Sequence, residues 1–402
     1  MITAPETEIE LPEGFSFSSI AAGIKASGRP DLALVACCAE TRAAAVFTKN
    51  RVVAAPVQVG RAALKSGRGS IRAVLVNSGN ANCATGVRGW ESARQVCSQA
   101  ARLLKVKSKH VFPSSTGIIG VQLPADKIMS ALPSLVSGLE ASQESLCRFS
   151  RTILTTDTRP KLSFRKLEQS GVECRILGIA KGSGMIHPKL ATMLVYLFTD
   201  MQATPAQLRR ILRETCDETF NCISVDGDTS TNDTVLILAS GKSNLRLSPR
   251  TEKGFRRALL QVCESLAEQI VSDGEGVQHV IRLEIEGARN RKEGMQLARA
   301  IAHSPLVKTA WAGADPNWGR ILAACGNSGV AIDPARVDIF IGDQKVCERG
   351  QACPFDEHTA HGHLSGSACR VRVRLTRGNE NLRFYTTDLT AEYVRINADY
   401  ST

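Results

Sequence analysis

Hydrophobic residues along the chain form short runs that predict strands. Residues 193–198 are six apolar residues in a row, a pattern typical of a strand covered on both faces. Two more runs, 33–38 and 43–48, are separated by the stretch 39–42 and predict a β-hairpin. Further strands are predicted at residues 72–76, 174–180, 234–239, 281–286, 337–341 and 370–375.

Other segments repeat apolar residues at helical spacing. Helices are predicted at residues 90–105, 255–270 and around 297–301. Residues 123–150 predict two helices, because Pro133 is unfavourable inside one. Thr204-Pro-Ala-Gln207 is a strong helix start, with Thr as the cap and Gln three residues later. Residues 313–320 predict a loop anchored by Trp318.

A polar loop containing Gly182 and Gly184 leads into the apolar run at 193, and its last residues are Ala191 and Thr192. For a single Thr at a strand start, strand propensity is the ordinary explanation. A threonine hydroxyl becomes an effective nucleophile when its own α-amino group, freed by chain cleavage, takes its proton. An α-amino group has a pKa of about 7.7 to 8.0, so part of it is unprotonated near neutral pH. Cleavage between Ala191 and Thr192 would therefore create a catalytic group.

Other polar positions have both an ordinary and a functional interpretation. Thr116-Gly117 is a plain turn or a turn that aims a hydroxyl and a backbone N–H at an oxyanion. Thr155 either caps local backbone or hydrogen-bonds a carboxylate. Lys181 is either a solvated charge or the partner of a substrate carboxylate. Glu275, between two glycines, is either a turn residue or a group that binds an ammonium ion.

These motifs occur together in one known family. The segment 181–200 closely resembles the self-cleaving ornithine acetyltransferases, also called bifunctional glutamate N-acetyltransferases, in which Lys-Gly-x-Gly-Met leads to Ala-Thr-Met. Other matching blocks span nearly the whole chain, at residues 21–25, 76–82, 114–120, 155–158, 225–234, 273–276, 304–309, 313–320 and 396–400. So many blocks in one order make chance similarity a poor explanation.

The resemblance implies roles for individual residues. Thr192 is the expected nucleophile, and cleavage of the Ala191–Thr192 bond is expected to give associated chains of residues 1–191 and 192–402. Thr116 and Gly117 match the oxyanion-hole pair of the family. Substrate contacts are expected at Thr155, Lys181, Thr192, Glu275, Asn397 and Thr402.

The resemblance also implies a fold and an activity. The implied fold is α/β, an αββα sandwich like that of ornithine acetyltransferases and the self-processing enzyme DmpA, with a smaller C-terminal α/β part. The implied reaction is ping-pong transfer of an acetyl group from N2-acetylornithine to glutamate through acetyl-Thr192, in a dimer of cleaved αβ units. No metal or organic cofactor is expected, and acetyl-CoA stays open as a second acetyl donor.

Two other functions fit the same motifs. One is a self-cleaving amidohydrolase or aminopeptidase in which water is the acceptor, and the other is an inactive binding protein. The chain also departs from the family pattern at His187, at 277–279, where Ala-Thr-Lys is common, and at 385–388, where a Trp-Gly-Cys-Asp-like segment is usual. These departures spare Thr192, Lys181 and Glu275 and leave the fine substrate preference open.

Composition argues against several other classes. With 402 residues and 43% hydrophobic content the chain can bury a real core. Its acidic first ten residues lack the features of a secretory signal or a transit peptide, and no apolar run approaches the roughly 20 residues of a membrane span. The chain is therefore expected to be cytoplasmic.

The net charge of +11 is dispersed, and the aromatic content of 5% shows no interleaving with basic residues. We therefore expect no nucleic-acid partner, although a positive field favours anionic small substrates.

No metal site is expected from the sequence. The 13 cysteines are scattered without a CxxC pair, which favours buried free thiols. One cluster lacks paired ligand spacing: Cys347, Cys353, His358, His361 and His363. Residues 226–233 resemble a calcium loop, but Thr231 and Ile237 stand where such a loop requires Gly and Glu. A hydrogen-bonded turn is predicted there instead.

Overall fold

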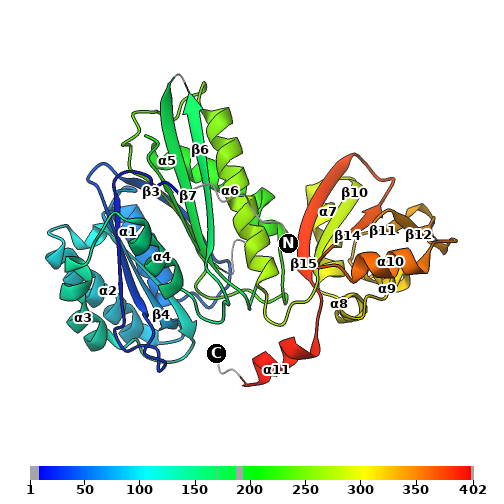
Figure 1. The fold of residues 1–402 in the computed structure, drawn as a ribbon, viewed down its shortest axis with the longest axis horizontal. Coiled ribbons are helices and arrows are strands. Elements are labelled where there is room, and N and C mark those ends of the chain that lie inside the picture. Colours follow the sequence, from blue (N-terminus) through cyan, green and yellow to red (C-terminus); the bar gives the residue numbers. More distant parts are fainter. Residues whose placement is uncertain (1–8, 170, 187–192, 400–402) are drawn as a thin grey trace.

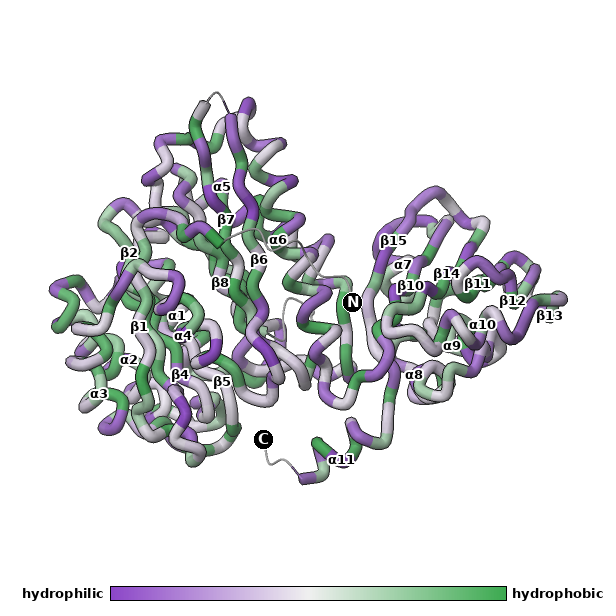
Figure 2. The backbone as a smooth tube through the Cα atoms, in the orientation of Figure 1, coloured by the Kyte–Doolittle hydropathy of each residue, from purple (hydrophilic) through white to green (hydrophobic). Residues whose placement is uncertain are grey.

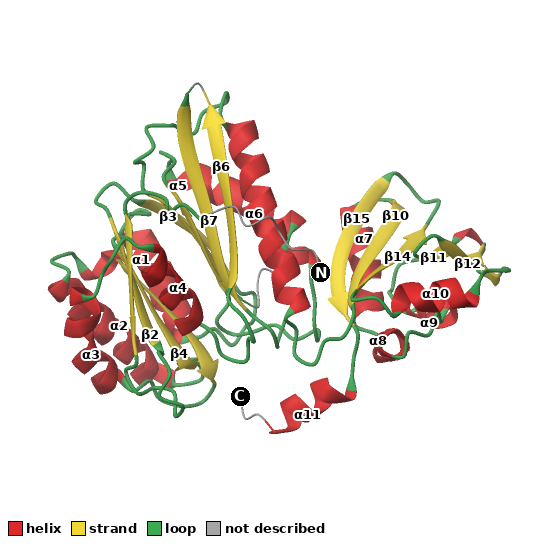
Figure 3. Ribbon diagram, in the orientation of Figure 1, coloured by secondary structure: helices red, strands yellow, loops and turns green. Residues whose placement is uncertain are grey.

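The computed structural model describes residues 9–169, 171–186 and 193–399. These residues form a large two-sheet sandwich and a smaller C-terminal unit, with the last helix running back from the smaller unit toward the sandwich (Figure 1). Helices cover the outer face of each sheet of the sandwich (Figure 3).

The first sheet has the order β1-β2-β4-β5. Its strands are β1 (Phe15–Ile20), β2 (Leu32–Cys37), β4 (Ala73–Asn80) and β5 (Val111–Ile118). The β4–β5 pair is parallel and the others are antiparallel. The associated helices are α1 (Ala55–Ser66), α2 (Gly86–Leu103), α3 (Ala125–Ser137) and α4 (Gln143–Thr152), with a 3-10 turn η1 (Ser108–His110). Helices α2 and α3 pack on the outer face of this sheet, through apolar residues such as Cys97 and Leu132.

The second sheet has the order β3-β9-β8-β7-β6. Its strands are β3 (Arg42–Phe47), β9 (Thr234–Ala239), β8 (Leu194–Thr199), β7 (Val172–Lys181) and β6 (Lys161–Gln169). Two helices, α5 (Pro205–Glu218) and α6 (Glu252–Ser272), cover its outer face, and η2 (Phe220–Cys222) follows α5. The predicted cap of α5 is confirmed, because the Thr204 hydroxyl accepts from the N–H of Gln207.

The position of strand β8 explains why residues 193–198 are all apolar. All six residues of the strand are buried. Leu194, Tyr196 and Phe198 face the core between the two sheets, whereas Val195 and Leu197 face α5 and α6. Figure 2 shows this hydrophobic colouring along the central strands. The layers are therefore helix, sheet, sheet, helix, which is the expected αββα sandwich.

Two local predictions for the sandwich were wrong, the hairpin at 33–48 and the helix break at Pro133. Residues 33–38 and 43–48 do not form a hairpin, because β2 lies in the first sheet and β3 in the second. Both strands are largely buried, so the turn at 39–42 carries the chain from one apolar layer to the other. Pro133 lies inside α3, and the break between the two predicted helices comes instead at Gly138 to Ser142.

The C-terminal unit is built on a six-stranded sheet of order β13-β12-β11-β14-β10-β15. The strands are β10 (Val280–Ala288), β11 (Asp338–Ile341), β12 (Gln344–Glu348), β13 (Gln351–Ala352), β14 (Ala368–Arg374) and β15 (Glu380–Thr387). The helices are α7 (Arg291–Ala302), α8 (Pro305–Ala312), α9 (Trp318–Gly326) and α10 (Glu357–Leu364), with η3 (Pro334–Arg336). The predicted loop at 313–320 is confirmed for residues 313–317 and wrong for the last three, which begin α9. The Asn317 side chain caps this helix by accepting from the N–H of Arg320.

Contacts between β15 and α6 hold the C-terminal unit against the sandwich. The Tyr385 hydroxyl donates to Glu268 Oε1 at 2.6 Å, and Arg383 forms an ion pair with Glu264. Beyond β15, helix α11 (Ala391–Asp399) leaves the unit and has no fully buried residue. No helix within the described ranges is both long and apolar enough to cross a membrane.

Gly178 lets α6 pack tightly on β7. A Cβ atom at Gly178 would lie 2.6 Å from Leu266 Cδ1 and 2.7 Å from Val262 Cγ1. We therefore expect Gly178→Val to lower the free energy of unfolding by about 1–3 kcal/mol, because overpacking displaces α6. Urea unfolding monitored by circular dichroism measures the change. Gly326→Ala, where an added Cβ meets nothing within 4 Å, is the control. Equal stability of Gly178→Val and wild type would contradict this account of the packing.

Candidate active site

One cavity brings together the predicted site residues that the structure describes. It has a volume of about 280 Å³. The predicted residues that line it are Thr116, Gly117, Thr155, Lys181, Glu275 and Asn397. They come from the ends of β5 and β7, from the segments after α4 and α6, and from α11. Residues far apart in the chain therefore share one small volume.

Four other sequence predictions lie outside the described residues, namely those at His187, Ala191, Thr192 and Thr402. The next residue after Thr192 in the chain is described. Met193 lines the cavity, and its carbonyl accepts from the N–H of Thr234 at 3.0 Å. The strand that follows Thr192 therefore begins at the cavity wall.

Lys181 contributes an ammonium group to the cavity from the last position of β7. Its Nζ donates to Thr155 Oγ1 at 2.8 Å and to Thr116 Oγ1 at 3.4 Å. Asp157 Oδ2 lies 3.7 Å from the same nitrogen. Lys181 therefore connects the predicted oxyanion turn with the predicted carboxylate-binding threonine.

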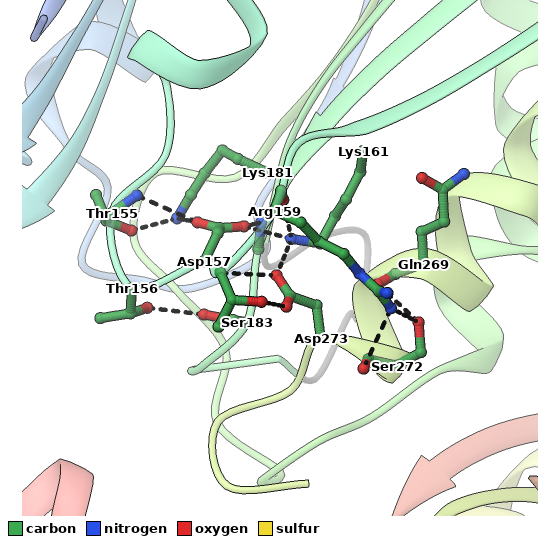
Figure 4. A network of polar contacts seen from close by, with 12 residues as sticks. Thr155, Thr156, Asp157, Arg159, Lys161, Lys181, Ser183, Gln269, Ser272 and Asp273 are labelled. Carbon is green, nitrogen blue, oxygen red and sulfur yellow. Dashed lines mark hydrogen bonds and ion pairs between the residues drawn. The ribbon is translucent and has the colours of Figure 1, made fainter. Parts of the chain in front are cut away.

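A buried ionic network lies directly behind Lys181 (Figure 4). Asp157 Oδ1 accepts from Lys161 Nζ at 2.7 Å and from the N–H of Gly182 at 2.6 Å. Lys161 Nζ also donates to Asp273 Oδ2 at 2.6 Å. The side chains of Asp157 and Lys161 are fully buried, and that of Asp273 is 4% exposed. Asp273 in turn accepts from the N–H and the hydroxyl of Thr158.

The charges in this network balance within the buried volume. Burial alone would raise the pKa of Asp157, but the charges of Lys181 and Lys161 outweigh it and lower that pKa to about 2. Asp157, Asp273, Lys161 and Lys181 then carry two negative and two positive charges. Of the two lysines in this network, Lys181 lines the cavity and Lys161 does not.

Thr116 and Gly117 do not form the predicted turn but lie near the end of β5, where they pair with the end of β4. Gly117 has φ of +131°, and a Cβ there would lie 2.3 Å from the carbonyl carbon of Gly79. Only glycine fits this approach. Asn232 Nδ2 donates to the carbonyls of Ala81 and Ser115 at 2.6 and 2.8 Å, which ties both strand ends to the loop before β9. The end of β5 is thus held in a fixed position.

Glu275 lines the cavity from the turn after α6. A Cβ on Gly184 would lie within 2.5 Å of all three atoms of the Glu275 carboxylate group, so this carboxylate rests on the glycine backbone. Asn397 Nδ2 of α11 donates to Glu275 Oε2 at 3.0 Å. A Cβ on Gly276 would lie 2.4 Å from the Tyr393 nitrogen, so α11 also packs closely on this turn. The last helix therefore completes the cavity.

The loop at 226–233 forms another wall of the cavity. It is a hydrogen-bonded turn, as predicted, in which Asp226 Oδ1 accepts from the N–H of Asp228 at 3.2 Å. Burial raises the pKa of Asp226 to about 6, against the opposing effect of the backbone N–H groups that it accepts. Burial and the nearby carboxylates, Asp226 first among them, also raise the pKa of the Tyr393 hydroxyl.

The histidines near Cys347 have backbone partners. His361 Nδ1 lies 2.9 Å from the Ala314 carbonyl oxygen, and the ring of His363 bonds to the backbone of Arg370. Across the described ranges, no three His, Cys, Asp or Glu side chains form a group that could hold a metal ion.

Sequence reasoning missed the residues that support the site. Asp157 lies only four positions before Lys161, but Asp273 lies 112 positions after Lys161 and 116 after Asp157. Nothing in the sequence therefore linked Asp273 to the other two residues. The sequence offered one indication of this network, namely Lys161 at the start of a partly apolar strand. A buried lysine needs acidic partners, so its position indicates that carboxylates lie nearby. Tyr393 gave no signal at all.

Lys161→Met tests the buried network. The substitution leaves Asp157 and Asp273 without their shared cation, so we expect a loss of about 3–5 kcal/mol in the free energy of unfolding. Lys166→Met is the matched control on the same strand, because Lys166 pairs with Glu10 and Glu173 at the surface and is expected to contribute at most about 1 kcal/mol. Chemical denaturation measures both variants. Similar losses for the two would contradict the role assigned to Lys161.

Comparison with known proteins agrees with the motifs. The family model described as the ArgJ family matches residues 16–402. The arginine biosynthesis bifunctional protein ArgJ of Geobacter sulfurreducens is 44% identical over 394 residues, covering 97% of this chain and 99% of that protein. The protein of the same name from Thermotoga neapolitana is 42% identical over 400 residues, covering 98% and 100%.

Among solved structures, an ArgJ chain from Bacillus halodurans is 41% identical, with a TM-score of 0.49, and the match covers 50% of this chain and 96% of that one. The match of the family model to nearly the whole chain and the two full-length relatives establish the assignment. The chain therefore belongs to the ArgJ family of bifunctional acetyltransferases of arginine biosynthesis.

Proposed function

We propose that the chain cleaves itself between Ala191 and Thr192, and that Thr192 then carries an acetyl group from N2-acetylornithine to glutamate. The observation that supports this most is the cavity wall. Met193, which follows Thr192, lines the same cavity as Thr116, Gly117 and Lys181. The family resemblance supplies the role of each residue.

Self-cleavage begins when the Thr192 hydroxyl oxygen attacks the Ala191 carbonyl carbon. The acyl group moves from the Thr192 nitrogen to its oxygen, and water then hydrolyses the ester to give an Ala191 carboxylate and a free α-amine on Thr192. The two chains stay associated because the cut separates neighbouring strands of one sheet. Strand β7 of the first chain pairs with β8 of the second, from Ile176 opposite Thr199 to Lys181 opposite Leu194. Strand β3 of the first chain pairs with β9 of the second.

In turnover, the Thr192 hydroxyl attacks the acetyl carbonyl while its α-amine takes the proton. Thr116 and Gly117 stabilise the oxyanion of the tetrahedral intermediate. The protonated amine then gives its proton to the leaving nitrogen of ornithine, and acetyl-Thr192 remains. The amine of glutamate then attacks this ester and gives a proton to the α-amine of Thr192. The bond between the acetyl carbon and the Thr192 oxygen breaks, that oxygen takes the proton back, and N-acetylglutamate leaves.

Charges across the cavity suit amino-acid substrates. Lys181 and Thr155 lie together on the sheet side, where they pair with the α-carboxylate that both substrates carry. Glu275 and Asn397 lie together on the α11 side, where the carboxylate binds an ammonium group such as that of ornithine. Acetyl-CoA as a second donor belongs to the same proposal, since it would form the same acetyl-Thr192.

Thr192→Ala tests the nucleophile. We expect wild-type protein to give two fragments by intact mass, ending at Ala191 and beginning at Thr192, and the variant to stay in one piece without acetyl exchange. Thr309→Ala, an exposed change in α8, is the control and should split normally. An intact Thr192→Ala chain that still exchanged acetyl groups would refute the mechanism. Release of free acetate in place of transfer to labelled glutamate would favour the hydrolase alternative.

Glu275→Gln tests substrate binding separately from cleavage. The amide keeps an acceptor for Asn397 but loses the negative charge, so we expect the KM for N2-acetylornithine to rise about ten- to a hundredfold. Self-cleavage should proceed normally. Steady-state kinetics with Glu91→Gln, an exposed position of α2, as the control measures the effect. An unchanged KM would argue against an ammonium contact at Glu275.

A further inference from the structure

Ile186 is the last described residue before the proposed cleavage position, and one turn holds both polar groups of its backbone. Its N–H donates to Asp226 Oδ1 at 2.8 Å. Its carbonyl oxygen accepts from the Val225 N–H at 2.7 Å and from the Ser224 hydroxyl at 3.0 Å. The side chain of Ile186 is also fully buried. The chain is therefore anchored firmly at this point.

Met185, the preceding residue, has an unusual backbone conformation. Its φ is +56°, in the left-handed region that residues with a side chain rarely adopt. The N–H of Met185 donates to Asp226 Oδ2 at 2.6 Å. Two successive N–H groups thus converge on the two oxygens of one carboxylate, an arrangement that stabilises such a turn by charge-assisted hydrogen bonds. Within the described residues, the Asp226 carboxylate accepts the hydrogen bonds of both N–H groups, those of Met185 and Ile186.

The C-terminal unit supports the turn from behind. Lys308 Nζ, on a side chain that is almost fully buried, donates to the Val225 carbonyl at 2.9 Å and to Thr387 Oγ1 at 3.1 Å. His303 Nε2 lies 3.0 Å from the Ser224 hydroxyl, whose proton goes to Ile186. Because the support comes from buried groups, the carboxylate of Asp226 has a fixed position.

We propose that Asp226 is a positioning residue for self-cleavage. It holds Met185 in its left-handed conformation and so fixes the direction in which the chain leaves Ile186 toward the Ala191–Thr192 peptide. Asp226 acts through the backbone and needs no contact with the reacting atoms. This inference rests on the proposed self-cleavage.

The test compares the rates at which freshly expressed full-length chains split, measured by intact mass over time. Asp226→Ala removes both acceptors, so we expect self-cleavage to slow about tenfold or more, the effect of losing one or two hydrogen bonds to a charged group. Asp226→Asn keeps one acceptor oxygen and nearly the same volume, and it should be slowed as well. Thermal unfolding of the uncleaved material reports whether each variant is folded.

A second substitution separates positioning from other roles. Glycine adopts positive φ without steric cost, so Met185→Gly introduced into Asp226→Ala should restore much of the lost rate. Failure of this rescue in a folded double variant would overturn positioning through Met185 and show that Asp226 acts by another route. If Asp226→Ala is unfolded, Asp226→Asn with and without Met185→Gly gives the same comparison.

Thr192→Ala, run beside these variants, distinguishes the two proposals. If Thr192→Ala splits like wild type, the proposed function itself fails. If Thr192→Ala stays intact while Asp226→Ala splits at the wild-type rate, only the inference about Asp226 is overturned.

Discussion

The site depends on a lysine that is buried inside the protein with two aspartates. Lys161 bonds to Asp157 at 2.7 Å and to Asp273 at 2.6 Å, and none of the three is appreciably solvated. Asp157 fixes Gly182 and faces Lys181, whereas Asp273 ends α6 two positions before Glu275. The network therefore helps to set the separation of two charged groups that line the cavity, Lys181 and Glu275. Such an arrangement is stable only while every charge has its partner.

The sandwich would keep the two proposed chains together after self-cleavage. Strands β7 and β8 lie side by side, so their pairing does not need the bond between residues 191 and 192. The core between the sheets takes Leu177 from one side of that bond and Tyr196 from the other. The C-terminal unit then contributes α11, which brings Asn397 to Glu275. Both sheets of the sandwich, the turn after α6 and helix α11 thus contribute residues to one small cavity.

Much of this arrangement could be predicted from the sequence, because it depends on local patterns and on motifs. The apolar run of β8, the Thr204 cap of α5 and the site residues Thr116, Gly117 and Lys181 are examples. Interactions across long sequence distances could not be predicted, and the contact between Lys161 and Asp273 is one. The supposed hairpin at 33–48 failed for a related reason, since two apolar strands joined by a short turn pair equally well with different sheets.

The proposed function depends above all on Thr192 carrying the acetyl group. The most direct measurement is the intact mass of both fragments after incubation with N2-acetylornithine in the absence of glutamate, followed by peptide mapping. We expect the fragment of residues 192–402 to gain one acetyl group on Thr192 and to lose it when glutamate is added. Transfer to glutamate without any acetylated Thr192, or with the acetyl group on another residue, would contradict the account.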